Sequence, residues 1–210
     1  MMKIALLIYP QFSLYEITPL TSQLRLHFQQ TIDLIASQKK LYSSEEGIQV
    51  MPNYSLSEID LSSYQLVLLS GTMAPFQAVN DEEVITALSK LDLTKIVVAS
   101  ISSSPLLLAR ANLLNERQFT GGLYSNYFGT FSWLKEGQFL PRQCVVIDKN
   151  LITAIGSSQA VEIFTRLVLA KLNFTKDWPA LSEEEISFTL EKNDFQKMLE
   201  DMKRDYPKLI

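Results

Sequence analysis

The fold of this chain is decided by the stretch Lys95-Ile96-Val97-Val98-Ala99-Ser100-Ile101-Ser102-Ser103-Ser104-Pro105-Leu106-Leu107-Leu108-Ala109. Its first half is a continuous apolar run of the kind that forms a buried strand. Three serines follow, and Pro105 begins a helix at the position where its missing N–H costs nothing. A sharp turn from strand to helix exposes the side chain at its tip beside free backbone N–H groups. The sequence therefore predicts that Ser102 stands above an α/β sheet.

Strand-like and helix-like segments alternate along the rest of the chain. Apolar or β-branched runs predict strands at 4–9, 31–36, 65–69, 96–99, 144–147 and 151–154. A hairpin is expected between 41–42 and 48–51, and a second turn at Asp148-Lys149-Asn150. Helices are expected at 16–29, at 80–91 behind an Asn80–Glu83 capping box, at 105–112 with a left-handed end at Asn112, and at 160–172. This alternation predicts an α/β fold, in which helices cover both faces of a largely parallel sheet.

Residues 174–210 follow the last of these helices, so we expect one domain over 1–173 and a C-terminal helical extension over 174–210 that packs on it. Two capping boxes predict two short helices there, Ser182 with Glu185 and Asn193 with Gln196. The second helix carries an apolar stripe at helical spacing, formed by Phe195, Met198, Leu199, Met202 and Tyr206. Such a stripe either docks on the body of the protein or binds another protein, and docking is the interpretation we favour.

Composition narrows the possible functions. The chain has 210 residues, 47% of them hydrophobic, which is ordinary for a globular domain. The net charge of −4 argues against a nucleic-acid partner. The only cysteine, Cys144, lies in an apolar run, so we expect a buried, inert thiol and a reducing compartment. With His27 as the only histidine, we expect no metal site and no cofactor. No signal peptide or membrane segment is recognisable, which favours the cytoplasm and excludes a membrane partner.

Four segments in order resemble the DJ-1/PfpI superfamily, over roughly residues 3–172. The first runs from Lys3 through Tyr9-Pro10 and leads to Glu16, like the family's opening strand and acidic residue. Ser70-Gly71-Thr72, after the strand at 65–69, resembles the Pro-Gly-Gly loop. Ile101-Ser102-Ser103-Ser104-Pro105 resembles the Ile-Cys-x-Gly-Pro elbow. The fourth resemblance lies in Asp148-Lys149-Asn150-Leu151-Ile152-Thr153-Ala154, followed by Glu162-Ile163-Phe164.

This resemblance implies a flavodoxin-like three-layer sandwich of the class I glutamine amidotransferase-like kind. It also implies a small pocket where the elbow, the acidic residue and the glycine loop meet, and a homodimer. Activities across the family range from hydrolases and lyases to chaperones and sensors, so membership does not select a function. The departures are informative: Ser102 replaces the elbow cysteine, Ser104 the elbow glycine and Thr72 the second loop glycine. The position where members often carry a histidine has Gly121-Gly122-Leu123.

Ser102 and Glu16 are the candidate catalytic residues. A serine hydroxyl needs a base, and a carboxylate is a poor one unless it is desolvated. The alternative is that Ser102 is a small polar residue that satisfies a buried turn, and Glu16 a residue that solvates a helix start. Gly71, Thr72, Ser103 and Ser104 are the candidate ligand-binding residues, because they would place hydroxyl and N–H groups beside the elbow. A threonine at position 72 predicts a changed loop, or an N–H that points elsewhere.

Tyr124, Tyr127, Phe128, Phe131 and Trp133 crowd one further segment. They form either a roof over the pocket, as the resemblance implies, or a packed aromatic helix, which we favour. Three functions follow from these observations. The first is a protein that lacks the family's cysteine chemistry and binds a small polar molecule at the elbow. The second is a serine-based hydrolase or lyase, amidase-like or glyoxalase-like. The third is a structural or partner-binding protein that acts through its C-terminal helix.

Overall fold

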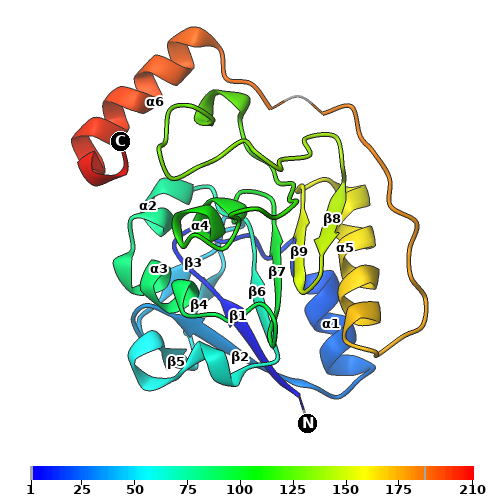
Figure 1. Ribbon diagram of the computed structural model, residues 1–210. Helices are drawn as coiled ribbons and strands as arrows, with labels where there is room; N and C mark the ends of the chain where they lie inside the picture. Colours follow the sequence, from blue (N-terminus) through cyan, green and yellow to red (C-terminus); the bar gives the residue numbers. More distant parts are fainter. Residues whose placement is uncertain (1, 187) are drawn as a thin grey trace.

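A seven-stranded, mostly parallel sheet forms the centre of the molecule (Figure 1). The computed structural model describes residues 2–186 and 188–210. Every neighbouring pair in the sheet is parallel except β8 and β9, which form an antiparallel edge. The strands, in their order across the sheet, are β5 (Tyr54–Ser55), β2 (Thr31–Ala36), β1 (Lys3–Leu7), β6 (Leu66–Leu69), β7 (Val97–Ile101), β9 (Leu151–Ala154) and β8 (Val145–Asp148).

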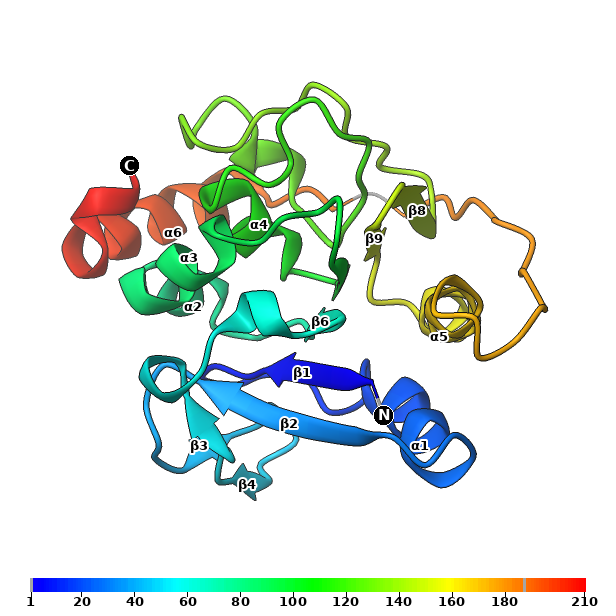
Figure 2. The same cartoon turned by 60° about the horizontal axis from the view of Figure 1, so that its bottom comes forward.

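Helices cover both faces of this sheet, which gives three layers (Figure 2). One face carries α1 (Thr18–Leu26) and α5 (Ser158–Lys171), which lie side by side. The other carries α2 (Pro75–Val79), α3 (Glu82–Ser89) and α4 (Pro105–Arg110). A small antiparallel hairpin of β3 (Tyr42–Ser43) and β4 (Gln49–Val50) stands apart from the sheet. The predicted flavodoxin-like sandwich is therefore confirmed.

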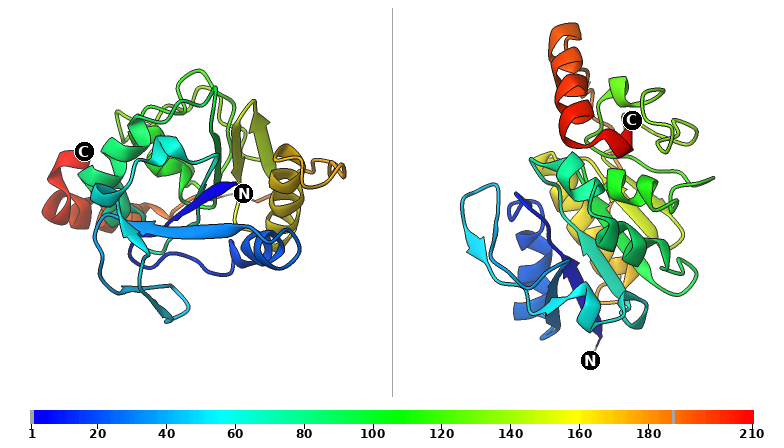
Figure 3. Two further views of the ribbon diagram at one scale, coloured as in Figure 1. Left: turned by 90° about the horizontal axis from the view of Figure 1, so that it is seen from below. Right: turned by 90° about the vertical axis from the view of Figure 1, so that its left-hand side faces the viewer.

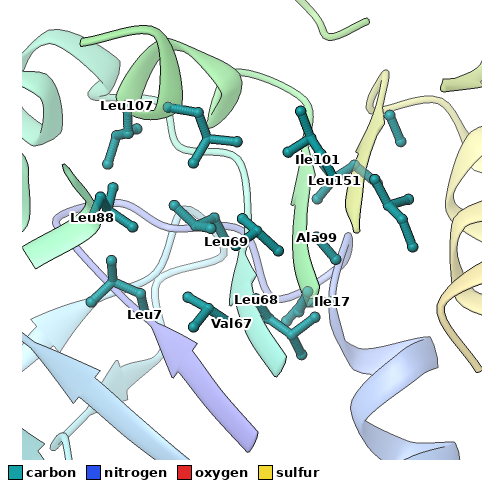
Figure 4. Close-up of a cluster of buried hydrophobic side chains, with 14 of the residues drawn as sticks. Leu7, Ile17, Val67, Leu68, Leu69, Leu88, Ala99, Ile101, Leu107 and Leu151 are labelled. Carbon is teal, nitrogen blue, oxygen red and sulfur yellow. The ribbon is translucent and has the colours of Figure 1, made fainter. Parts of the chain in front are cut away.

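The core lies between the sheet and its two helical layers (Figure 4). The central strands are continuous apolar runs because both of their faces are covered. Leu66, Val67, Leu68 and Leu69 are all fully buried. From β7, Ala99 and Ile101 pack beside them, and Leu107 and Leu88 close the layer from α4 and α3. This rigid centre fixes the positions of the loops that leave the carboxyl ends of the strands.

The element boundaries agree with most sequence predictions, including the strand over 31–36 and both turns. Asn112 adopts the left-handed conformation with φ of 61°, where α4 ends. The Asn80–Glu83 capping box was wrong. The N-cap of α3 is Asp81, whose carboxylate accepts from the N–H groups of Glu83 and Val84. An aspartate one residue later offers the same oxygen and adds a favourable charge at the helix start.

The C-terminal segment leaves α5, runs past β8 and crosses the top of the molecule in Figure 1 to α6 (Lys192–Asp205). The right-hand view of Figure 3 shows α6 at that end of the molecule. The helix predicted behind Ser182 was wrong, because the described residues between 174 and 191 are not helical. The Asn193–Gln196 capping box was also wrong, since the N-cap of α6 is Glu191, two residues earlier, and its side chain makes no capping bond. Backbone bonds to the body hold the segment extended instead, from Cys144 N–H to Ser182 O and from Glu184 N–H to Arg142 O.

The apolar stripe of α6 faces the body. Met202 is fully buried, and Phe195, Met198 and Tyr206 pack against the hydrophobic core, whereas Leu199 lies outside that contact. Beyond the helix, Leu209 is buried and its carbonyl accepts a hydrogen bond from the Trp133 indole at 2.9 Å. These residues of the stripe therefore contact the body of the protein. None of the helices formed by the described residues is long and apolar enough to cross a bilayer.

Candidate functional site

Four residues meet where neighbouring strands end. Glu16 lies in the segment after β1, Gly71 follows β6, Ser102 follows β7 and Gly156 follows β9. Parallel strands place their carboxyl ends at one edge of the sheet, and that edge is where α/β proteins bind ligands. The parallel register therefore brings together residues that are up to 140 positions apart in the chain, as the numbers of Glu16 and Gly156 show.

Ser102 stands in the tight turn between β7 and α4. Its φ of 62° lies in the left-handed region, which costs a non-glycine residue about 1–3 kcal/mol. The turn is held from both sides, because Ser102 N–H donates to Ala154 O at 2.8 Å and Gly122 N–H donates to Ser102 O at 2.7 Å. Such strain persists only where the surroundings impose it, so the backbone presents this one side chain in a fixed direction.

The carboxyl group of Glu16 contacts Ser102 directly. Glu16 is 7% exposed; its Oε2 accepts from Gly71 N–H at 2.6 Å, and the Ser102 hydroxyl hydrogen-bonds the same carboxyl group. Burial raises the pKa of Glu16 to about 7, although both hydrogen bonds favour the ionised form. The nearby carboxylates of Glu45 and Glu46 raise the pKa further. At neutral pH the carboxyl group is therefore divided between its protonated and ionised forms.

The backbones of Gly71 and Gly156 approach Glu16 and Ser102 so closely that neither position has space for a side chain. A Cβ at Gly71 would lie 2.4 Å from Glu16 Oε2 and 2.7 Å from Ser102 Cβ. A Cβ at Gly156 would lie 2.7 Å from Glu16 Oε1 and 2.8 Å from Ser102 Oγ. Both positions require glycine because a side chain would enter the space of the pair. Gly122 is different, since a Cβ there would approach Ser102 no closer than 3.5 Å.

Of the other polar candidates, Ser104 lies in the core beneath the turn, whereas Thr72 and Ser103 line the pocket. Ser104 is fully buried beneath the turn, where its hydroxyl bonds Ser100 Oγ at 2.7 Å, Leu69 O at 3.1 Å and Ile101 N–H at 3.0 Å. It braces the turn and does not reach the pocket. Thr72 and Ser103 do reach it.

The N–H of Thr72 is already engaged. It donates to Ser103 Oγ at 2.9 Å, and that hydroxyl donates to Thr72 O at 3.1 Å. Thr72 has no positive φ, so the threonine fits this loop without the backbone strain that a left-handed conformation would impose. Within the described part of the chain, Ser103 N–H makes no backbone or side-chain hydrogen bond and remains open. Of the two expected N–H donors, one is therefore engaged by the protein and one is not.

A pocket of about 690 Å³ opens above the pair. Four of the candidate residues line it, Glu16, Thr72, Ser102 and Ser103, and the rest of the lining is formed by Glu45, Met73, Pro75, Phe76, Leu106, Gly122, Tyr124, Tyr127, Gly156, Ser157, Ile186, Phe188, Leu190, Asp194 and Met198.

The packed aromatic helix expected at 124–133 was wrong, because only one 3₁₀ turn forms there, Ser125–Tyr127. Two tyrosines of this segment instead form part of the pocket wall.

The C-terminal segment supplies the rest of that wall, which sequence reasoning missed. Ser125 N–H donates to Phe188 O at 2.8 Å, and Leu190 N–H donates to Asn126 Oδ1 at 2.8 Å. These bonds seat Phe188 and Leu190 over the pocket, and α6 adds Met198. The only sequence signal was an alternation of apolar residues at 186, 188 and 190, which predicts an extended segment but not what it covers.

Cys144 and His27, the only cysteine and the only histidine of the sequence, lie outside the pocket. Cys144 is buried, and burial raises the pKa of its thiol, so it has the character of an inert core thiol. His27 caps the end of α1 and does not line the pocket. In the described ranges, no group of three or more histidine, cysteine, aspartate or glutamate side chains is placed to hold a metal ion.

Fold and site together define a class of protein: a flavodoxin-like α/β sandwich with a strained serine and a buried carboxyl group at the carboxyl edge of its sheet. A family model describes it further. The DJ-1/PfpI family model matches residues 2–170, and the chain belongs to that family. A search of curated proteins found no match to the sequence.

Solved structures show the same fold at low sequence identity. A two-domain protein of Anabaena variabilis with DJ-1/ThiJ/PfpI-like and ferritin-like domains aligns with a TM-score of 0.74 at 21% identity, over 86% of this chain and 50% of its own. The chain thus spans half of that protein. DJ-1 superfamily protein Atu0886 of Agrobacterium tumefaciens aligns at 0.72 and 16% identity over 97% and 99%. Drosophila melanogaster DJ-1beta aligns at 0.69 and 22% identity over 84% and 93%.

Gly71 and Gly156 enclose the Glu16–Ser102 pair from two sides, an arrangement called the glycine clamp below. We therefore expect alanine to be more harmful at Gly156 than at Gly122, which lies outside the clamp. Gly156→Ala should lower the free energy of unfolding by about 1–3 kcal/mol, because its methyl group overlaps Glu16 and Ser102. Gly122→Ala should change it by less than about 1 kcal/mol, since the added methyl makes ordinary contacts. Urea unfolding of both variants measures the difference. Equal effects would contradict the clamp.

The buried carboxyl group predicts a specific pH dependence of stability. Glu16 holds its proton more tightly in the folded protein, where its pKa is about 7, than in the unfolded chain, where it is near 4.5. The free energy of unfolding should therefore fall as the pH rises from about 4.5 to about 7, by roughly 3 kcal/mol, and level off above. Glu16→Gln removes this contribution. Urea unfolding of both proteins across this range should give curves that diverge, and parallel curves would contradict the buried carboxyl group.

Proposed function

We propose that this protein binds a small polar molecule in the pocket above Ser102 and does not form a covalent bond with it. The single observation that supports this most is the hydrogen bonding around the turn. A pocket of ligand size is present, yet Thr72 N–H, the donor that would stabilise an oxyanion, is held by Ser103 Oγ. A second donor is usually needed to stabilise the charge of a covalent intermediate.

The proton acceptor beside Ser102 is also weak. An alkoxide forms only when a base of suitable strength removes the hydroxyl proton. Glu16, with a pKa of about 7, is half-ionised near neutral pH but far less basic than an alkoxide. Among the lining residues that the structure describes, there is no histidine to relay the proton. These features favour recognition of a ligand over attack on it.

A serine-based hydrolase or lyase, of the amidase or glyoxalase-like kind, is the second candidate. A specific observation favours it: Ser102 is held at φ of 62° against a carboxyl group whose pKa lies near neutrality. Strained residues and shifted pKa values concentrate at functional sites. In this candidate Ser102 is the nucleophile, Glu16 its base, and Ser103 N–H one oxyanion donor.

The remaining parts of the proposal concern assembly and location. The buried free thiol of Cys144 fits a cytoplasmic, reducing compartment. Three exposed apolar side chains, Leu41, Ile48 and Met51, lie on or next to the β3–β4 hairpin, and exposed apolar patches mark association surfaces. We propose a homodimer on this ground and on family membership. The docked stripe of α6 argues against the third candidate, a partner-binding C-terminal helix.

An activity-based label separates the first two candidates. A fluorophosphonate probe should label the wild-type protein no more than it labels Ser102→Ala, because Ser102 lacks a competent base and a pair of donors. Ser103→Ala is the informative control, since it releases Thr72 N–H while leaving Ser102 in place. Labelling of the wild type that Ser102→Ala abolishes would establish the serine enzyme instead. Intact-protein mass spectrometry measures the outcome.

A further inference from the structure

The charges of the pocket all have one sign. Three carboxyl groups line it: Glu16 at its floor, Glu45 from the β3–β4 hairpin and Asp194 from the first turn of α6. Among the described lining residues there is no lysine, arginine or histidine. Glu45 and Glu46 are close enough to raise the pKa of Glu16 by their negative charge. An anionic ligand would enter against this potential, whereas a cation would lower its energy.

Aromatic rings make up much of the remaining wall. Phe76 and Tyr127 lie with ring centroids 5.4 Å apart, Tyr127 and Tyr124 also at 5.4 Å, and Tyr124 and Phe188 at 6.3 Å. Each contact is edge-to-face, so the four rings form a continuous row from α2 to the C-terminal segment. Ring faces attract organic cations, and clusters of aromatic rings recognise substituted ammonium groups. Carboxylates nearby add a Coulombic attraction for the same groups.

One hydroxyl group in the wall has no partner in the protein. Tyr127 is 5% exposed and lines the pocket, and within the part of the chain that the structure describes, its hydroxyl makes no hydrogen bond. The hydroxyl oxygen is not fully enclosed, and polar groups in pockets of this kind are commonly satisfied by the ligand. Burial raises the pKa of Tyr127, so its hydroxyl stays neutral and its oxygen can accept an N–H bond.

We propose that the pocket selects an amphipathic organic cation, namely a protonated or substituted amine on an apolar or aromatic body. The ammonium group lies among the carboxylates of Glu45 and Asp194 and the Tyr127 hydroxyl. The apolar body packs against Phe76, Phe188 and Met198. This inference rests on the proposed binding function and narrows the class of ligand from any polar molecule to an organic cation.

Three probes of similar size and different charge test the proposal: phenethylamine, phenethyl alcohol and hydrocinnamate. Isotope-labelled methionine methyl groups report binding by NMR, because Met73 and Met198 line the pocket whereas Met51 does not. Phenethylamine should shift Met73 and Met198, leave Met51 unchanged, and bind about tenfold more tightly than hydrocinnamate.

Variants identify the groups responsible. Glu45→Gln and Asp194→Asn should each weaken phenethylamine about two- to fivefold, as for a partly exposed charge pair, and Tyr127→Phe should do the same by removing the acceptor. Glu200→Gln is the matched control, because it changes the net charge equally on α6 but lies outside the pocket. Thermal unfolding of each variant verifies that it is folded.

The outcomes separate this inference from the function on which it rests. If phenethyl alcohol or hydrocinnamate shifts Met73 and Met198 at lower concentration than the amine, the pocket binds ligands and the inference of a cation is wrong. If Glu200→Gln weakens the amine as much as Glu45→Gln does, the attraction is general and the assigned site is wrong. If none of the probes shifts either methionine at about 10 mM, both the inference and the proposed binding function are overturned.

Discussion

The contact between Ser102 and the buried carboxyl group of Glu16 is the constraint on which the site depends. It exists because two backbones approach it so closely that neither Gly71 nor Gly156 could carry a Cβ. The approach follows from the parallel register of β6, β7 and β9. The buried side chains of these strands pack in the core and fix the positions of the strand ends. The strain in the Ser102 backbone is therefore maintained by the packing of the whole sheet rather than by the turn alone.

Burial of Glu16 has a free-energy cost, and its surroundings increase that cost. Gly71 N–H and the Ser102 hydroxyl offset part of the lost hydration of the carboxylate. The β3–β4 hairpin works in the opposite direction. Glu46 accepts the N–H groups of Leu14 and Tyr15 at 2.9 Å and 2.8 Å, which anchors the loop before Glu16 but adds negative charge beside it. One hairpin thus positions the carboxyl group and raises its pKa, which gives the pocket its electrostatic character.

The pocket has two halves with different origins. Its floor comes from the sheet edge and lies within residues 2–170, the span of the family model. Its upper wall comes from the segment at 124–127 and from Ile186 and residues 188–198, which join through reciprocal bonds between Asn126 and Leu190. The C-terminal part of this second half lies beyond residue 170, where the match to the family model ends.

The sequence alone determined six of the seven strands of the sheet, the two hairpin turns and the position of Ser102, because each is encoded by local pattern: apolar runs, turn residues and a proline at a helix start. The two-residue edge strand β5, Tyr54–Ser55, carries no such pattern and was missed. It also indicated Glu16 and the altered loop at Thr72. Tertiary structure alone decided which hydroxyl reaches the pocket, since Ser103 and Ser104 are adjacent in sequence yet face the pocket and the core respectively. It decided as well that Gly156 clamps the pair and that Phe188 and Asp194 close the wall. These contacts join residues far apart in the chain, and no local pattern carries the long-range packing that places them.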